Sequence, residues 1–252
     1  MKSPPKTVRL RVQRFDPKTG AEPRYDEFEV PTKPGMTVLD ALFHVLEKKD
    51  RMLAFRYSCR SAVCGSCASF INGRQRLACN SQLSDLGSDI TIGPLPHIPV
   101  VRDLVVDLHP FFHKIDMVEP YFEAKEPFPA KEFKQTPKDR LAIDVAIDCI
   151  DCAACYSACP MTWTDPAYPG PAAFVKAARF IADTRDDAKF ERLRLVSCED
   201  GLWRCHTVFN CADACPKSID PPHFIQYLKR EETKLPFSVK VNAFRKTRVK
   251  EI

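Results

Sequence analysis

Long apolar runs and nucleotide-binding motifs are both missing from this sequence. No window approaches about 18 uninterrupted apolar residues, so we do not expect the chain to cross a bilayer. Glycine is scarce, with eight among 252 residues, and neither G-x-G-x-x-G nor G-x-x-x-x-G-K-S/T occurs. These absences exclude the common dinucleotide and nucleoside triphosphate sites.

The opening residues lack the apolar stretch of a signal peptide, and no long Arg/Ser-rich presequence precedes the first predicted strand. We therefore expect neither export nor organelle import. The formal net charge of +5 permits an acidic partner or a membrane surface, but it is no signature of nucleic-acid binding, and we expect no nucleic-acid partner. The 44% apolar content supports a packed core, and the length favours two small domains.

Cysteine, by contrast, is abundant and clustered. The chain has twelve cysteines in three groups: Cys59, Cys64, Cys67, Cys79; Cys149, Cys152, Cys155, Cys159; and Cys198, Cys205, Cys211, Cys215. Structural disulfides are rare inside cells and join distant loops, whereas metal sites gather their ligands closely. The pattern predicts metal binding.

The first part of the chain, residues 1–108, reads as a β-rich domain. Thr37 is a plausible N-cap for a helix over residues 38–49, and Asn72-Gly73 suits a tight hairpin turn. Strand patterns cover residues 8–15, 25–30, 68–71, 90–92 and 100–108.

The second part, residues 109–252, reads as a connector followed by helices. Residues 109–138 are rich in Pro, Lys and Glu, and we expect them to lie ordered on a surface because their aromatic side chains need burial. Those aromatic residues are Phe111, Phe112, Tyr121, Phe122, Phe128 and Phe133. The clearest helices span 172–184, preceded by Pro171 in the first turn, and 222–232. The basic tail, 234–252, is expected to be solvated or to lie on a partner.

The first cysteine group has the plant-type spacing C-x4-C-x2-C with a fourth cysteine beyond it. Three thiolates from one short loop can converge on two irons, and the small residues of the loop let backbone amides point at the sulfurs. A zinc site is the alternative, but zinc ribbons prefer two separated C-x2-C pairs. We predict a 2Fe–2S cluster held by Cys59, Cys64, Cys67 and Cys79.

The later cysteines form an internal repeat of the bacterial ferredoxin run C-x2-C-x2-C-x3-C-P. In two-cluster ferredoxins the fourth cysteine of each run ligates the cluster of the other run. This exchange predicts a 4Fe–4S cluster held by Cys149, Cys152, Cys155 and Cys215.

The second copy of the repeat lacks one cysteine. It contributes Cys205 and Cys211, takes Cys159 from the first run, and has Val208 where a thiolate would stand. Because valine cannot coordinate iron, we predict a 3Fe–4S cluster at this site. Cys198 lies outside both copies, and a buried, inert thiol is favoured over a redox or ligand role.

Three clusters in one chain would form a one-electron relay. No catalytic acid–base pair stands out, so two-electron substrate chemistry is expected on the organic cofactor of a partner. A hypothesis of another class is a protein that senses oxygen or iron through its clusters. Sensors of that kind usually need one cluster and an effector module, which disfavours this alternative.

In this order the motifs resemble the iron–sulfur subunit of succinate dehydrogenase and fumarate reductase. The resemblance covers essentially the whole chain and includes residues 58–67, 94–107, 170–172 and 205–217. It implies an α+β fold, in which an N-terminal β-grasp domain of the plant-type 2Fe–2S ferredoxins precedes an all-α domain of the bacterial two-cluster type.

The resemblance also implies partners. The 2Fe–2S domain would face a flavoprotein subunit that oxidises succinate at covalently bound FAD. The 3Fe–4S end would face membrane anchor subunits, with or without haem, where quinone is reduced. The residues implied on the quinone side are Pro160, Trp163, His206 and Val208.

The chain would then be a peripheral membrane subunit of succinate dehydrogenase on the cytoplasmic face of a bacterial inner membrane. It would serve the tricarboxylic acid cycle and the respiratory chain. The same relay running in reverse in a quinol:fumarate reductase is the alternative, although residues 205–211 look more like the succinate-oxidising branch.

Some positions depart from the pattern of relatives or allow two interpretations. Ubiquinone-using relatives often carry two consecutive tryptophans where this chain has Trp163-Thr164, so the quinone type stays open. Relatives commonly have Glu-Gly at Ser61-Ala62, and because alanine tolerates positive φ poorly we expect a slightly different bend without loss of a ligand. Arg56 and Arg60 would either offset thiolate charge or pair with acidic residues of the flavoprotein.

Overall fold

Strand β1 (Thr7–Arg14) alternates inward-facing apolar and outward-facing charged side chains, as the sequence predicts. Val8, Leu10 and Val12 are buried, whereas Arg9 and Arg11 are exposed. The chain is described by a computed structural model over residues 5–20 and 22–235.

The described residues fold into two units. The first comprises the residues up to Leu108 together with Ile150–Ala158. The second comprises His109–Cys149 and the residues from Cys159 onward. The short segment 150–158, which carries two cysteines of the first ferredoxin run, therefore groups with the N-terminal residues.

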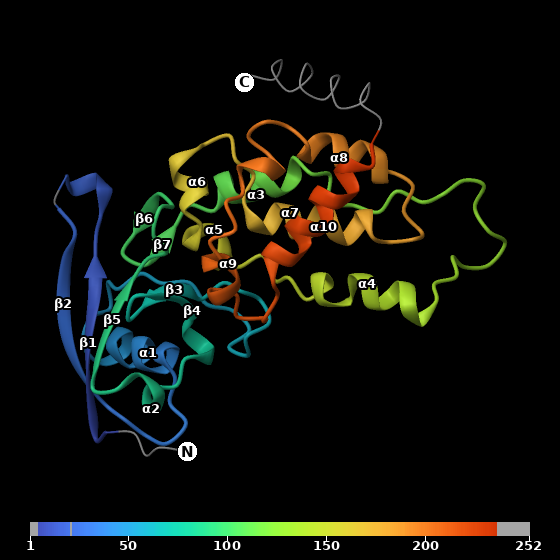
Figure 1. Ribbon diagram of the computed structural model, residues 1–252. Helices are drawn as coiled ribbons and strands as arrows, with labels where there is room; N and C mark the ends of the chain where they lie inside the picture. Colours follow the sequence, from blue (N-terminus) through green and yellow to red (C-terminus); the bar gives the residue numbers. More distant parts are fainter. Residues whose placement is uncertain (1–4, 21, 236–252) are drawn as a thin grey trace. The chain divides into compact units, whose positions relative to one another are not determined.

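The first unit is built on a mixed sheet (Figure 1). The strands lie in the order β2-β1-β5-β3-β4, in which β1 and β5 are parallel and the other neighbours are antiparallel. The further strands are β2 (Arg24–Pro31), β3 (Ala68–Ile71), β4 (Arg74–Leu77) and β5 (Asp89–Gly93). Between β3 and β4, Asn72 and Gly73 have φ values of +47° and +77°, which confirms the predicted tight turn.

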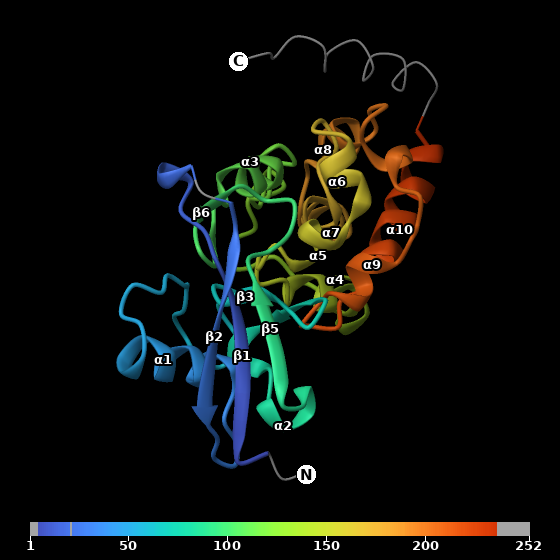
Figure 2. The same ribbon diagram turned by 90° about the vertical axis from the view of Figure 1, so that its left-hand side faces the viewer.

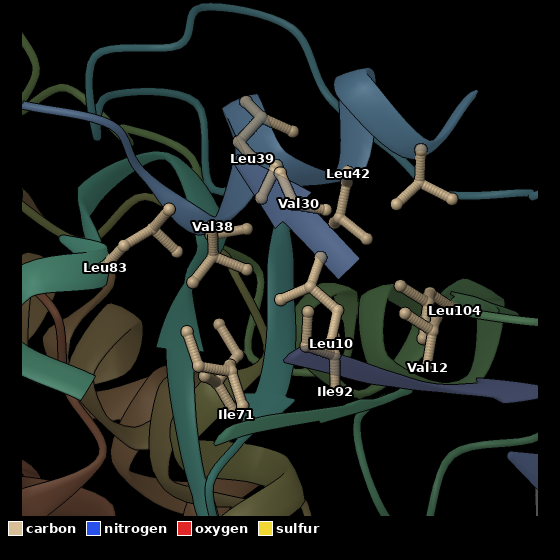
Figure 3. Packing of buried hydrophobic residues seen from close by; sticks show 14 of the residues in the cluster. Leu10, Val12, Val30, Val38, Leu39, Leu42, Ile71, Leu83, Ile92 and Leu104 are labelled. Atoms are coloured by element: carbon tan, nitrogen blue, oxygen red, sulfur yellow. The ribbon is translucent and has the colours of Figure 1, made fainter. Parts of the chain in front are cut away.

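Helix α1 (Val38–Lys48) covers one face of this sheet. Thr37 caps it and forms a capping box with Asp40, which confirms the predicted start of the helix. Leu39 and Leu42 project from α1 toward the sheet residues Leu10 and Ile92 (Figure 3). A mixed sheet covered by such a helix is the predicted β-grasp arrangement.

Residues 100–108 were predicted to form one strand-like segment, and the structure differs. The segment forms a small hairpin of β6 (Val100–Arg102) and β7 (Val105–Val106), and the turn between them places Asp103 at a φ of +46°. Asp103 is almost completely buried.

Long-range contacts hold this turn in place. The Asp103 carboxylate accepts hydrogen bonds from the amides of Phe15 (3.1 Å) and Ala54 (2.9 Å) and from Arg14 Nε (3.1 Å). Because the partners are remote in the sequence, local alternation of apolar residues could not reveal the turn. The remaining elements of the first unit are η1 (Pro17–Thr19), η2 (Ala78–Asn80), α2 (Leu83–Leu86) and α5 (Ala154–Ala158).

The second unit is helical, as predicted for the residues from 139 onward. Its elements are α3 (His109–Asp116), α4 (Pro137–Ile147), α6 (Pro160–Thr164), α7 (Pro171–Ile181), α8 (Lys189–Val196), η3 (Leu202–Arg204), α9 (Asn210–Asp213) and α10 (Pro221–Thr233). Helices α7 and α10 confirm the two clearest helix predictions and lie side by side (Figure 1, Figure 2).

Helix α7 lies at the centre of this unit. It contacts α3, α4, α8 and α10. Pro171 occupies its first turn, where the missing N–H is not needed, and this confirms the predicted position. Alanine residues let neighbouring helices approach α7 closely, and Phe174 fills the interior between them.

The connector departs from its prediction in two respects. It begins with a helix, α3, which buries Phe111. The expected burial is wrong for Phe112, Tyr121, Phe122 and Phe128, whose side chains are exposed. Beyond α3, ring contacts among the aromatic residues of the connector replace burial in the core, as between Phe122 and Phe133 with centroids 6.1 Å apart.

A buried arginine ties the connector to the helices. Arg192 of α8 is fully buried, pairs with Asp186, and donates hydrogen bonds to the carbonyl oxygens of Glu119 (3.0 Å) and Tyr121. The predicted basic tail lies outside the described residues from position 236 onward. Within the described part of the chain, no helix combines the length and apolar composition that crossing a membrane requires.

Candidate metal centres

The loop that carries the first three cysteines surrounds their sulfurs with backbone N–H groups. Cys59 Sγ accepts hydrogen bonds from the amides of Ser61 (3.4 Å), Val63 (3.3 Å) and Cys64 (3.2 Å). Cys64 Sγ accepts one from the amide of Cys59 (3.4 Å). Cys79 Sγ accepts one from the amide of Ala62 (3.3 Å), and Cys67 Sγ accepts one from the amide of Cys79 (3.5 Å). N–H donors stabilise negative charge on sulfur, so this loop suits thiolates. The donor set fits the predicted 2Fe–2S cluster.

The backbone reaches this arrangement through left-handed residues. Arg60, Ala62 and Gly65 have φ values of +58°, +55° and +74°. The alanine at position 62 therefore adopts a positive φ, at a cost of roughly 1–2 kcal/mol, and its amide still reaches Cys79.

The thiols of this loop differ in how readily they ionise. A hydrogen bond from the Ser66 side chain lowers the pKa of Cys64 to about 6. Burial raises the pKa of Cys67 to about 12. Cys64 therefore loses its proton more readily than Cys67.

Arg60 places a positive charge beside this site. Its guanidinium lies over the ring of Phe43, 4.5 Å from the centroid, and over that of Tyr57, 5.4 Å away. Phe43 and Tyr57 are themselves packed edge to face, with centroids 4.6 Å apart. The two rings hold the guanidinium by cation–π attraction, whether it offsets thiolate charge or meets a partner.

The segment 150–158 packs directly on this loop within the first unit. A Cβ atom at Gly65 would lie 2.8 Å from Cys152 Cβ and 2.9 Å from the carbonyl oxygen of Ile150. Farther along the segment, Ser157 Oγ donates a hydrogen bond to the carbonyl oxygen of Pro96 (2.8 Å). Only glycine allows the two backbones to approach this closely.

The four predicted ligands of the 4Fe–4S cluster are divided between the two units. Cys152 and Cys155 belong to the first unit, and Cys149 and Cys215 to the second. Cys149 and Cys215 pack against the same small apolar cluster, which contains Ala146, Val175 and Ile219. The assignment of all four to one cluster remains a prediction.

The three thiols predicted to hold the 3Fe–4S cluster lie together in the second unit. Cys159 immediately precedes α6. Burial is the main cause that raises the pKa of its thiol, and the charge of the neighbouring Cys205 raises it further. Cys211, in α9, has a pKa raised to about 12 by burial and then by the charges of Cys159 and Cys205. The structure thus brings these three side chains into one environment.

A buried hydroxyl, that of Tyr168, lies beside these thiols. Tyr168 Oη is buried and makes no hydrogen bond of normal geometry to any described residue. An unsatisfied buried hydroxyl costs about 1–3 kcal/mol, so this site suits a bound group that supplies an acceptor. Cluster sulfurs are acceptors, and the residues present therefore fit an iron–sulfur cluster.

Among residues 5–20 and 22–235, no three Cys, His, Asp or Glu side chains converge tightly enough to hold a single metal ion. A cluster of several irons keeps its ligand sulfurs farther apart than one ion does. Hydrogen bonding to the thiols and their burial therefore indicate whether these residues suit an iron–sulfur cluster.

Most of the predicted quinone-side residues are accessible. Trp163 and Val208 are each 49% exposed, His206 is exposed, and Pro160 is half-buried in the first turn of α6. Thr207, which separates His206 from Val208, adopts a φ of +56°.

Two further exposed aromatic residues lie in the same loop region and were not predicted, Trp203 and Phe209, each 52% exposed. Lys229 Nζ lies 5.2 Å from the Trp203 ring centroid and donates a hydrogen bond to the carbonyl oxygen of Cys205 (3.1 Å). Their closeness in sequence to Cys205 and Cys211 is the signal that could have identified them.

Cys198, the cysteine outside both ferredoxin runs, is only half-buried. Burial raises its pKa, which lowers the fraction of reactive thiolate at neutral pH. Gly201 packs closely on it, since a Cβ there would lie 2.9 Å from Cys198 Sγ. The predicted burial of Cys198 is therefore wrong, since the side chain is only partly covered, and its inertness stays a prediction.

Comparison with known proteins identifies both halves of the chain. Residues 9–113 match the model of a 2Fe-2S iron-sulfur cluster binding domain, and residues 145–219 match that of a 4Fe-4S dicluster domain. The predicted succession of a plant-type and a two-cluster ferredoxin domain is thereby confirmed.

Two curated relatives extend over most of the chain. The succinate dehydrogenase iron-sulfur subunit of Paracoccus denitrificans is 43% identical, over 88% of this chain and 86% of its own length. The fumarate reductase iron-sulfur subunit of Haemophilus influenzae is 36% identical, over 90% of this chain and 93% of its own.

A solved structure has the same fold. A chain of the Mycobacterium smegmatis Sdh1 complex in the apo form superimposes with a TM-score of 0.82 at 26% identity, covering 90% of this chain and 95% of that one. With these sequence relatives and the two ferredoxin domains, the protein belongs to the family of iron–sulfur subunits of succinate dehydrogenase and fumarate reductase.

Proposed function

We propose that this chain is the electron-transfer subunit of a membrane-bound succinate:quinone oxidoreductase. It carries electrons one at a time from the FAD of a flavoprotein subunit to quinone at membrane anchor subunits. We assign residues 1–108 to its 2Fe–2S domain and residues 109–252 to the connector and the two-cluster domain, of which residues 150–158 pack with the first unit. The observation that supports this most strongly is the group of Cys159, Cys205 and Cys211, beside which the half-exposed Val208 replaces a fourth thiol.

Each cluster, when bound, accepts and donates a single electron. Cys59, Cys64, Cys67 and Cys79 would hold the 2Fe–2S cluster, and the N–H groups of their loop would stabilise the charge on its sulfurs. Cys149, Cys152, Cys155 and Cys215 would hold the 4Fe–4S cluster, and Cys159, Cys205 and Cys211 the 3Fe–4S cluster.

The quinone would lie beside Pro160, Trp163, His206 and Val208. Trp163 and His206 are exposed and carry N–H groups that can bond the carbonyl oxygens of a quinone as negative charge develops there. Pro160 and Val208 would contribute apolar contacts.

Dehydrogenation of succinate would occur on the flavoprotein, because this chain supplies no acid–base pair for it. The anchors would hold the subunit on the cytoplasmic face of a bacterial inner membrane. The direction of succinate oxidation is favoured over fumarate reduction, because residues 205–211 look more like the succinate-oxidising branch.

Low-temperature EPR of the purified complex, combined with turnover assays, tests this proposal. We expect signals of all three cluster types and quinone reduction that depends on succinate. Intact clusters without succinate-dependent quinone reduction would favour the sensor hypothesis. A complex that turns over without a 3Fe–4S signal would contradict the assignment of the third site.

A further inference from the structure

Tyr168 lies in the turn between α6 and α7, inside the core of the second unit. Its side chain is 1% exposed and packs against Phe174, with ring centroids 5.5 Å apart. Its backbone is held separately, since its amide donates to the carbonyl oxygen of Asp165 (3.1 Å). The packing role belongs to the ring, and a phenylalanine ring could fill it. The hydroxyl contributes nothing to this packing.

The hydroxyl is surrounded by the thiols of the predicted 3Fe–4S site. Tyr168 belongs to the same apolar cluster as Cys159, and Cys205 packs against that cluster. The ionisable side chains that surround its hydroxyl are those of Cys205, Cys159 and Cys211. The phenol O–H is a donor, and a sulfur atom of a cluster at this site would give it the acceptor that no described residue provides with normal hydrogen-bond geometry.

We propose that the Tyr168 hydroxyl donates a hydrogen bond to a sulfur atom of the 3Fe–4S cluster and thereby raises its reduction potential. The inference rests on the proposed function, since it requires that cluster. Reduction by one electron adds negative charge to the cluster, and a hydrogen bond to sulfur stabilises the more negative state more strongly. Tyr168 is therefore a tuning residue at the last step before quinone.

The variant Tyr168→Phe in the intact complex tests this role, because it removes the hydroxyl and keeps the ring. We expect the oxidised 3Fe–4S EPR signal to keep its full spin count. In a redox titration the ratio of reduced to oxidised cluster at a fixed potential should fall about tenfold. For a one-electron couple this is a downward shift of about 59 mV.

Tyr227→Phe is the matched control. Tyr227 packs against the same apolar cluster, and burial raises its pKa to about 12, but its charged neighbours are Glu231 and Arg230. The midpoint of this variant should equal that of the wild type. An unshifted midpoint in Tyr168→Phe, or an equal shift in Tyr227→Phe, would overturn the proposal.

A second measurement covers the case in which Tyr168→Phe fails to retain the cluster. Pulsed EPR of the wild-type complex in H2O and D2O should reveal an exchangeable proton coupled to the 3Fe–4S cluster, and its absence would refute the hydrogen bond. If the wild-type complex shows no 3Fe–4S signal, the proposed function fails first, so the two failures are distinguishable.

Discussion

Replacing Gly65 by alanine tests the closest approach of two backbone segments in the first unit. The new Cβ would lie 2.8 Å from Cys152 Cβ and 2.9 Å from the Ile150 carbonyl oxygen, both closer than atoms normally pack. Neither neighbour is the end of a flexible side chain, so the clash cannot be relieved by a rotamer change. The loop of the first cluster site or the segment 150–158 must move.

The expected cost has two parts. Gly65 has a φ of +74°, and a side chain in the left-handed region costs roughly 1–2 kcal/mol. The steric conflict adds about 1–3 kcal/mol, the usual range for overpacking a tight interior. Together these parts predict a destabilisation of about 2–5 kcal/mol.

Gly73→Ala is a matched control that separates the two parts. Gly73 has nearly the same φ, +77°, but no atom lies within 4 Å of a Cβ built there. This variant should therefore lose only the conformational part, about 1–2 kcal/mol.

Loss of the visible iron–sulfur absorption on heating, at one fixed scan rate, provides the assay, because unfolding of such proteins is commonly irreversible. For a chain of this size about 1 kcal/mol corresponds to roughly 2–4 °C, so Gly65→Ala should lower the midpoint by about 4–20 °C and Gly73→Ala by about 2–8 °C. Equal losses in the two variants would show that segment 150–158 does not pack on Gly65.

Further variants test the cluster assignments and the quinone side. Val208→Cys supplies the missing thiolate, so the oxidised 3Fe–4S EPR signal should be replaced by that of a four-iron cluster of lower potential; a signal of wild-type intensity would contradict the assignment. Cys215→Ser should reduce the 4Fe–4S EPR signal more than the 3Fe–4S signal. A larger loss of the 3Fe–4S signal would refute the crossed pairing. Cys198→Ser should leave all three clusters intact, and loss of any cluster would overturn the interpretation of an inert thiol. His206→Ala and Trp163→Phe should keep the clusters and the reduction of an artificial dye at the flavin, but lower succinate-driven quinone reduction about tenfold, which corresponds to about 1.4 kcal/mol; wild-type quinone rates would move the site to the anchor subunits.

Features that depend on neighbours in the chain could be predicted from the sequence. The start of α1 at its Thr37 cap, the turn at Asn72-Gly73 and the first-turn position of Pro171 all follow from local backbone preferences. The cysteine spacings are local as well, and they sufficed to predict the iron–sulfur domains that the family models match.

The connector shows where such local reasoning fails. Because the connector contains many aromatic residues, burial of their side chains was predicted. Phe128, however, is 66% exposed, and of the six aromatic residues only Phe111, on a helix that contacts α7, is fully buried. Which of several similar side chains becomes buried depends on where the neighbouring helices pack, and the composition of a segment does not contain that information.

Only the tertiary structure determined the contacts between segments that are distant in the sequence. Asp103 breaks a strand-like segment because Arg14, Phe15 and Ala54 converge on its carboxylate. Gly65 is required because Cys152 packs against it, and the hydroxyl of Tyr168 acquires a role because folding buries it beside three thiols. Spacing along the chain identifies which residues can bind a cluster, whereas the atoms that surround those residues, and so control their charge and potential, are set by packing across the fold.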